Sequence, residues 1–157
     1  MEEEGMSHVT VGEVLPDISM TSLTGERVRI SEYRGRRALV LLMLGEPWNA
    51  ALVELLRALA ERYAEVRQEE AEVLATVPGP PETVEELART RSFPFPLLAD
   101  EDRRAHRLYG VLENGAVFVA DRYGEIYFIG KVEEGSAPPS VEDILSWVRF
   151  TEAQCPE

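Results

Sequence analysis

The sequence predicts one α/β domain in which a mixed β-sheet is flanked by helices. Two continuous apolar runs, residues 38–44 and 71–77, have the length of strands that are buried on both faces. Between them, apolar residues recur at helical spacing from residue 52 to residue 66. A strand, a helix and a second strand form a right-handed crossover, which makes the two strands parallel. The length of 157 residues suits one ordinary domain.

Further strands are expected on both sides of this parallel unit. Residues 18–23 and 27–30 flank a Thr-Gly-Glu turn and predict an N-terminal hairpin. The alternating pattern of residues 9–15 predicts an edge strand or hairpin arm before it. Residues 116–120 and 125–129 flank a glycine turn and predict a second hairpin. The sheet should therefore have a parallel half and an antiparallel half.

The remaining segments predict a short turn, an extended link and three more helices. Residues 31–35 have the pattern of a capped single turn, and residues 93–98 that of the link. The helices are expected over residues 82–91, from Asp100 as the cap to Tyr109, and over residues 140–154.

Charge and composition limit the expected class of protein. The domain should span residues 9–154, between a disordered N-terminus at residues 1–8 and a tail at residues 155–157. A net charge of −13 argues against nucleic acid or an anionic membrane as the partner, because both would be repelled. The N-terminus lacks the basic start and apolar stretch of a signal peptide, so we expect a cytosolic protein. No His, Cys or acidic spacing has the pattern of a metal site, so no metal or cofactor is expected.

Six short motifs follow one another along nearly the whole chain. They lie at residues 12–18 (Gly-Glu-Val-Leu-Pro-Asp-Ile), 23–26, 30–35, the apolar run 38–44, 95–100 with 109–111, and 118–126. In this order they resemble the peroxiredoxin or redoxin family, the alkyl hydroperoxide reductase/thiol-specific antioxidant group of the thioredoxin superfamily. The resemblance implies a thioredoxin-like, peroxiredoxin-type three-layer sandwich with a mixed central sheet and an N-terminal β-hairpin. It also implies an ancestry in thiol-dependent peroxide reduction or disulfide exchange, and homodimers as a common state.

The residues at the family's reactive positions are not nucleophiles. In the Trp-Cys-x-x-Cys register, Trp48 matches the tryptophan, but Asn49 and Leu52 stand at the two cysteine positions. In the peroxiredoxin register counted from Pro47, the cysteine position holds Glu54. Gly115 stands where thioredoxins have a cis-proline and many peroxiredoxins an arginine. Peroxide reduction needs a thiolate at this helix N-terminus, so a conventional peroxidase or dithiol cycle is not expected here.

Several of these residues allow two interpretations. The amide of Asn49 could bind a polar ligand at the helix N-terminus, but a helix cap is the favoured interpretation. Trp48 could form a recognition platform, although packing over the strand end is favoured. Glu54 is interpreted as a surface charge, and so is His106, because arginines surround it in sequence.

The single cysteine, Cys155, precedes a proline at the C-terminus. An intramolecular disulfide is therefore impossible. Some two-cysteine peroxiredoxins have a resolving cysteine before a proline near this end, which implies an intermolecular or mixed disulfide here. The alternative is an incidental thiol, which stays reduced in a cytosol.

Three functions follow from these alternatives. The first is a redoxin-fold binding or regulatory protein without conventional turnover, acting on a protein partner or as a homodimer. The second is a one-thiol oxidoreductase or peroxidase that uses Cys155 with a partner thiol or thiol reductant. The third is a small-molecule binder in the cleft near Trp48, Asn49 and Gly115.

Overall fold

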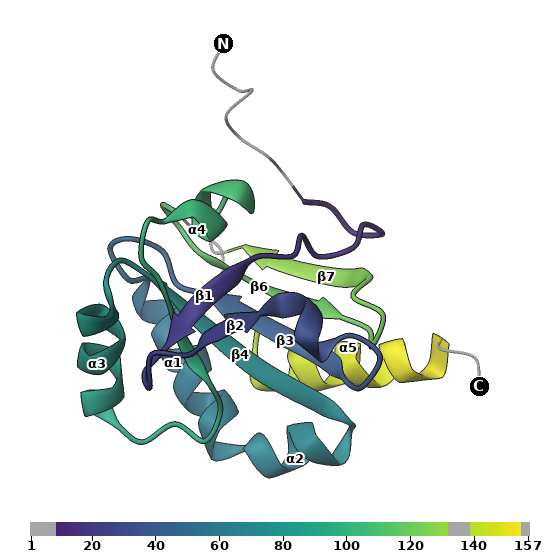
Figure 1. Ribbon diagram of the computed structural model, residues 1–157. Helices are drawn as coiled ribbons and strands as arrows, with labels where there is room; N and C mark the ends of the chain where they lie inside the picture. Colours follow the sequence, from purple (N-terminus) through teal and green to yellow (C-terminus); the bar gives the residue numbers. More distant parts are fainter. Residues whose placement is uncertain (1–8, 132–138, 155–157) are drawn as a thin grey trace.

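The computed structural model describes residues 9–131 and 139–154, which surround one central sheet (Figure 1). The sheet of these described residues has seven strands in the order β2-β1-β5-β4-β3-β6-β7. The strands are β1 (Ser19–Ser22), β2 (Arg27–Arg29), β3 (Ala38–Met43), β4 (Ala71–Pro78), β5 (Leu97–Asp100), β6 (Ala116–Ala120) and β7 (Ile126–Lys131). The predicted N-terminus at residues 1–8 and tail at residues 155–157 lie outside the described residues.

The centre of the sheet is parallel and its two sides are antiparallel. Strand β4 pairs in parallel with β3 and with β5. Strands β1 and β2 form the predicted N-terminal hairpin, and β6 and β7 form the second one. All six residues of β3 are buried, as expected for a strand covered on both faces. The mixed sheet predicted from the sequence is therefore confirmed.

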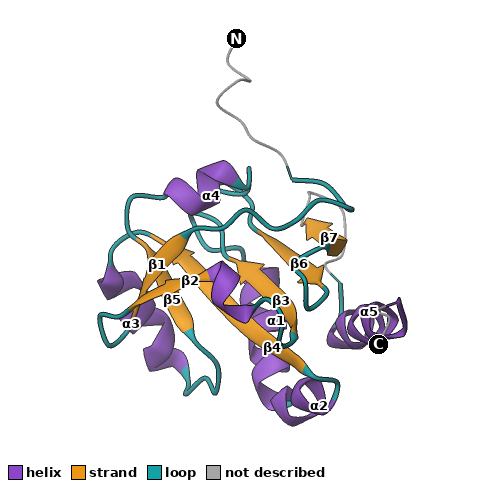
Figure 2. Cartoon of the chain, turned by 45° about the vertical axis from the view of Figure 1, so that its right-hand side comes forward, coloured by secondary structure: helices purple, strands orange, loops and turns teal. Residues whose placement is uncertain are grey.

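Helices cover both faces of the sheet (Figure 2). They are α1 (Ala50–Glu61), α2 (Tyr63–Gln68), α3 (Pro81–Thr90), α4 (Arg104–Leu108), α5 (Val141–Gln154) and a 3-10 helix, η2 (Ile30–Tyr33). Helices α1, α3 and α5 pack on one face, whereas α4, η2 and the segment before β1 pack on the other. No helix in the described ranges combines the length and the apolar character needed to span a bilayer.

The alternating side chains of β3 hold these layers together. Val40 and Leu42 enter the apolar cluster beneath α1, α3 and α5. Leu39, Leu41 and Met43 enter the second cluster, on the face that α4 covers. Successive side chains of a strand point to opposite faces, so one apolar run supplies both cores. The three-layer sandwich expected from the resemblance is therefore confirmed.

Three predicted elements were wrong in type or length. Residues 9–15 form no strand, and only Val14 makes an isolated bridge, to Glu125. Gly12 interrupts the extended backbone there with a φ of +97°. The predicted helix over residues 52–66 is divided at Arg62, where the backbone leaves the helical region and α2 begins.

The expected extended link is the third error, because its end is a strand of the sheet. Strand β5 pairs with β4 on one side and with β1 on the other, and all four of its residues are buried. Two prolines, Pro94 and Pro96, precede β5. Proline is rare inside strands, so the sequence favoured a link over a strand here. The carbonyl of Pro96 accepts a hydrogen bond from Ala75, so the pairing begins at a proline that needs no donor.

Candidate functional site

The N-terminus of α1 follows β3 through a short loop that contains Glu46, Pro47 and Trp48. Asn49 caps the helix, since its Oδ1 accepts hydrogen bonds from the N–H groups of Ala51 (2.8 Å) and Leu52 (3.4 Å). The capping interpretation of Asn49 is therefore confirmed. The helix N-terminus normally has free N–H groups that stabilise an anion, and here a neutral amide oxygen takes two of them.

Leu52 and Gly115, which are far apart in sequence, meet beside this helix. Gly115 has a φ of +75°, and a Cβ placed on it would lie 2.6 Å from Cδ1 of Leu52 and 2.6 Å from the carbonyl oxygen of Met43. No side chain larger than hydrogen fits that space without a shift of the backbone or of Leu52. Leu52 itself has no solvent-exposed surface. The two positions thus form a closed apolar contact.

The other predicted residues of this region serve the packing of the helix or lie on its surface. Trp48 is half-buried and packs against the apolar cluster beneath α1, as its structural interpretation predicted. Glu54 lies on the outer face of the helix and pairs with Arg57 at 3.1 Å. The interpretation of Glu54 as a surface charge is confirmed. Cys155 lies outside the described residues.

An ion pair joins the loop before α1 to the loop before α4. The guanidinium of Arg103 donates to both carboxylate oxygens of Glu46, at 2.6 and 2.7 Å. The Arg103 hydrogen bonds hold the pKa of Glu46 below its usual range. Arg103 has a left-handed backbone with φ of 63°, which turns the chain between β5 and α4. The carboxyl ends of β3 and β5 are therefore tied together by opposite charges.

A buried hydrogen-bonded chain lies next to this ion pair. Asp100 Oδ2 contacts Nδ1 of His106 at 2.7 Å, and Nε2 of His106 contacts Oγ1 of Thr76 at 3.2 Å. Asp100 also accepts hydrogen bonds from the backbone N–H groups of Ala105 and His106. Asp100 is 3% exposed, and His106 and Thr76 have no exposed surface. The prediction that His106 is a surface residue was wrong.

His106 was predicted to be exposed because its neighbours in sequence are arginines, but residues that are adjacent in a helix point in different directions. The neighbouring arginines point outward from α4, whereas His106 shares the inner face with Ala105 and Tyr109, which belong to the buried cluster. Asp100 does accept hydrogen bonds from the first turn of α4, as its capping interpretation required, but it is the last residue of β5. Burial raises the pKa of Asp100, but hydrogen bonds from His106 and Ala105 outweigh it and bring the pKa below its usual value.

The described residues bring the Asp, His and Thr side chains together without an open reaction centre. Thr76 is the only hydroxyl in this chain of hydrogen bonds, and it lies wholly inside the protein. Within the described part of the chain, no group of three or more His, Cys, Asp and Glu side chains is placed to bind a metal ion. The arrangement therefore stabilises the junction between β5 and α4.

Comparison with known proteins identifies the family. A profile of the AhpC/TSA family matches residues 11–129 of the chain. The chain belongs to the AhpC/TSA family. The resemblance found in the six sequence motifs is therefore confirmed.

Relatives of this AhpC/TSA member include both oxidoreductases and peroxide reductases. It is 29% identical over 119 residues to the thiol-disulfide oxidoreductase ResA of Geobacillus kaustophilus, which covers 75% of this chain and 67% of that protein. It is 28% identical over 147 residues to alkyl hydroperoxide reductase E of Mycobacterium bovis, covering 88% and 94% of the two chains. The ancestry in thiol oxidoreductase and peroxiredoxin proteins is thus established.

A solved structure supports the fold of this AhpC/TSA member at lower sequence similarity. Mycobacterium tuberculosis AhpC superposes with a TM-score of 0.79 at 16% identity, over 94% of this chain and 95% of that one. At this identity the similarity concerns the fold alone. The peroxiredoxin-type sandwich is therefore shared, whereas the chemistry must be argued from the residues at the end of α1.

Proposed function

We propose that this AhpC/TSA-family protein has lost conventional peroxidase and disulfide-exchange turnover and acts as a binding or regulatory protein. The observation that carries this proposal is the hydrogen bonding of Asn49 to the N-terminus of α1. In a thiol enzyme of this fold, the same N–H groups would stabilise a thiolate. Here they stabilise the helix.

The surroundings of the second reactive position support the same proposal. Leu52 stands at the second cysteine position of the Trp-Cys-x-x-Cys register and is fully buried. Its Cδ1 fills the space that any Cβ on residue 115 would need. Because the side chain of Leu52 fills the space beside Gly115, the same contact argues against a small-molecule site formed by Trp48, Asn49 and Gly115. A binding role would therefore use another surface.

We propose that the partner is either another protein or a second copy of this chain. Strand β7 is an edge of the sheet in the described part of the chain, and its first end contacts the segment that contains Gly12 and Leu15. An edge strand has backbone N–H and C=O groups that can pair with another chain. Phe150, beside Tyr127 of β7, is 47% exposed and adds apolar surface near this edge.

We also propose that the domain spans residues 9–154 and that the protein is cytosolic.

The alternative function is a one-thiol oxidoreductase or peroxidase. Cys155 is the only thiol of the chain and follows α5. Its thiolate could be oxidised by peroxide to a sulfenic acid, and a partner thiol would then condense with it and release water. A second molecule of the thiol reductant would reduce that mixed disulfide. This function needs no residue at the end of α1.

One assay separates these functions. Purified protein is given hydrogen peroxide, or a small disulfide, with excess dithiothreitol, and the wild type is compared with Cys155→Ser. Background rates that are equal in both proteins are the expected result. Turnover that disappears in Cys155→Ser would replace the proposal with the one-thiol alternative.

A gain-of-function variant tests whether the fold itself would permit the chemistry. The double substitution Asn49→Cys and Leu52→Cys restores the Trp-Cys-x-x-Cys pattern on a Cys155→Ser background. Disulfide reduction by this variant, without any in the parent, would show that the missing thiols are the cause of inactivity. The proposal would be wrong if the Cys155→Ser parent, which has no cysteine, reduced the disulfide above background and as fast as the wild type.

A further inference from the structure

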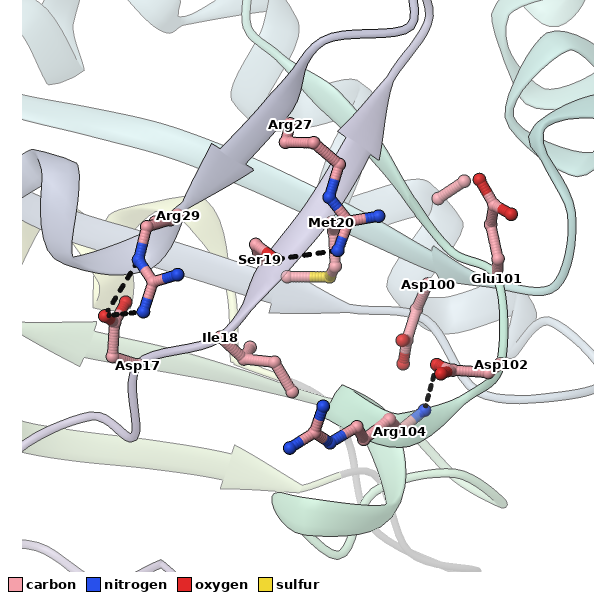
Figure 3. A pocket seen from close by; sticks show the side chains of 11 residues that line it. Asp17, Ile18, Ser19, Met20, Arg27, Arg29, Asp100, Glu101, Asp102 and Arg104 are labelled. Carbon is pink, nitrogen blue, oxygen red and sulfur yellow. Dashed lines mark hydrogen bonds and ion pairs between the residues drawn. The ribbon is translucent and has the colours of Figure 1, made fainter.

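A polar cavity of about 530 Å³ lies where β1 and β5 separate (Figure 3). The two strands pair only at Thr21 with Ala99 and at Ser22 with Leu98. The same register would place Ser19 opposite Glu101, but the chain turns toward α4 after Asp100 and leaves a gap. The residues that line the gap come from the N-terminal hairpin on one side and from the β5–α4 junction on the other.

The hairpin wall has a positive charge, Arg27, that no acidic side chain among the described residues pairs with. Arg27 donates hydrogen bonds to the hydroxyls of Ser19 at 2.7 Å and Thr21 at 3.3 Å. Both acceptors are neutral, so they hold the guanidinium in place without cancelling its charge. The neighbouring Arg29 is different, because its guanidinium pairs with Asp17 at 2.7 Å. Arg27 therefore has hydrogen-bond donors and a full charge available to a ligand.

The opposite wall has acidic side chains and one further arginine. Asp100 is satisfied by His106, but Glu101 is exposed, and no described residue pairs with its carboxylate. Asp102 is also exposed, and its Oδ1 accepts the backbone N–H of Arg104 at 3.1 Å, which leaves the carboxylate charge in place. Figure 3 shows the Arg104 side chain below Ile18, at the opposite end of the cavity from Arg27. The cavity is thus bipolar.

We propose that this cavity binds a small zwitterion, a short peptide with a free amino group and a free carboxylate. The ligand carboxylate would pair with Arg27, and its ammonium group with Asp102 and Glu101. A simple anion would face the acidic wall in a protein of net charge −13, and a simple cation would face two arginines. The volume lies within the range of known small-molecule sites, about 300–1,000 Å³.

This inference is independent of the fate of the α1 site. The β5–α4 loop separates the two places: Arg103 of that loop faces Glu46, whereas Asp102 and Arg104 line the cavity. Binding in the cavity can therefore be measured in a protein with or without thiol turnover. A negative result for one proposal therefore does not contradict the other.

Three matched probes test the requirement for both charges. Triglycine is the zwitterion, N-acetyl-triglycine lacks the ammonium, and triglycinamide lacks the carboxylate. Binding is followed by calorimetry at low ionic strength, where ion pairs are least screened. We expect triglycine to bind at least about threefold more tightly than either capped probe, as for ion pairs of partly exposed groups. Equal affinities for the three probes, or no binding of triglycine at millimolar concentration, would overturn the inference.

Charge substitutions assign each end of the ligand to a wall. Arg27→Gln should remove the advantage of triglycine over triglycinamide, and Asp102→Asn the advantage over N-acetyl-triglycine. Asparagine keeps the oxygen that accepts the Arg104 N–H, so the loop is retained. Arg89→Gln, on the exposed face of α3, is the matched control and should change neither ratio.

A second variant guards against misfolding of the hairpin. Arg27→Lys keeps a positive charge on the hairpin, so it should retain the advantage of triglycine over triglycinamide that Arg27→Gln loses. If a folded Arg27→Gln kept the same preference as Arg27→Lys, the proposed orientation would be wrong.

Discussion

The junctions β3–α1 and β5–α4 lie at the same end of the sheet but are built in opposite ways. At the first, Asn49 caps the helix and the buried side chain of Leu52 closes the space beside Gly115. At the second, a charged side chain, Asp100, is buried and hydrogen-bonded to His106. The family's reactive place is therefore occupied by neutral and apolar groups. The polar chemistry of this end of the molecule lies in the neighbouring junction.

The difference teaches that position in the fold and chemical capacity are separate properties. Carboxyl ends of parallel strands are favourable places for sites because loops and helix N-termini converge there. That favourable geometry is present in β3–α1, although no cysteine stands there. Function must be argued from the groups that stand at the site. Here those groups stabilise one junction by apolar packing and the other by a buried polar network.

The strongest test of the comparison is Asp100→Ala. It leaves His106 Nδ1 and two backbone N–H groups without their acceptor inside the protein. We expect a loss of about 3 kcal/mol in the free energy of unfolding, measured by urea denaturation. Asp102→Ala, in the exposed part of the same loop, is the control and should cost well under half as much. A loss below 1 kcal/mol for Asp100→Ala would mean that water replaces the network.

The pH dependence of stability tests the charge of the same pair. The pKa of Asp100 is lowered in the folded protein, so its contribution to stability is complete above its unfolded pKa of about 4 and is lost as the pH falls below that value. Stability should therefore fall between about pH 5 and pH 3, less steeply in Asp100→Asn than in the wild type. Protonation keeps the shape of the carboxyl group, so the loss should be smaller than in Asp100→Ala. Parallel curves for the two proteins would show that Asp100 is not the titrating group.

Gly115→Ala tests the closed contact at the first junction. The new methyl group would overlap Leu52 and the Met43 carbonyl at 2.6 Å, in a backbone conformation with positive φ. We expect the free energy of unfolding to fall by about 2–3 kcal/mol, from overpacking and backbone strain together. Gly25→Ala is the matched control, because Gly25 also has a positive φ of +91° but no atom within 4 Å of the added group. Equal losses at the two glycines would show that strain alone, without close packing, limits position 115.

Asn49→Ala should have the smallest of these effects. It removes the oxygen that accepts two backbone N–H groups, and a helix cap of this kind is worth about 1 kcal/mol. Asn49→Asp keeps the acceptor and adds a charge that the helix N-terminus favours, so it should be at least as stable as the wild type. Thermal unfolding of the three proteins at neutral pH gives the comparison. A destabilised Asn49→Asp would indicate that a neighbouring negative charge dominates at this junction.

Local patterns were sufficient for most of the elements and for the family. The buried strands β3 and β4, the two hairpins and the cap at Asn49 were predicted because each depends on residues close together in sequence. Strand β5 was missed because its four residues become a strand only through pairing with β4 and β1. Residues 9–15 gave the opposite error, since an alternating pattern without a full partner strand remained a loop with one bridge.

For the candidate sites too, some properties followed from local sequence and others only from the tertiary structure. The sequence by itself determined that no cysteine stands at the start of α1, because that conclusion needs only the identities of Asn49 and Leu52. The tertiary structure decided that Leu52 fills the space beside Gly115, that His106 is buried with Asp100, and that Arg27 and Asp102 line one cavity. These pairs are separated by many residues or depend on which side of a short helix faces inward. Burial and charge pairing are properties of the assembled layers, and no local pattern contains them.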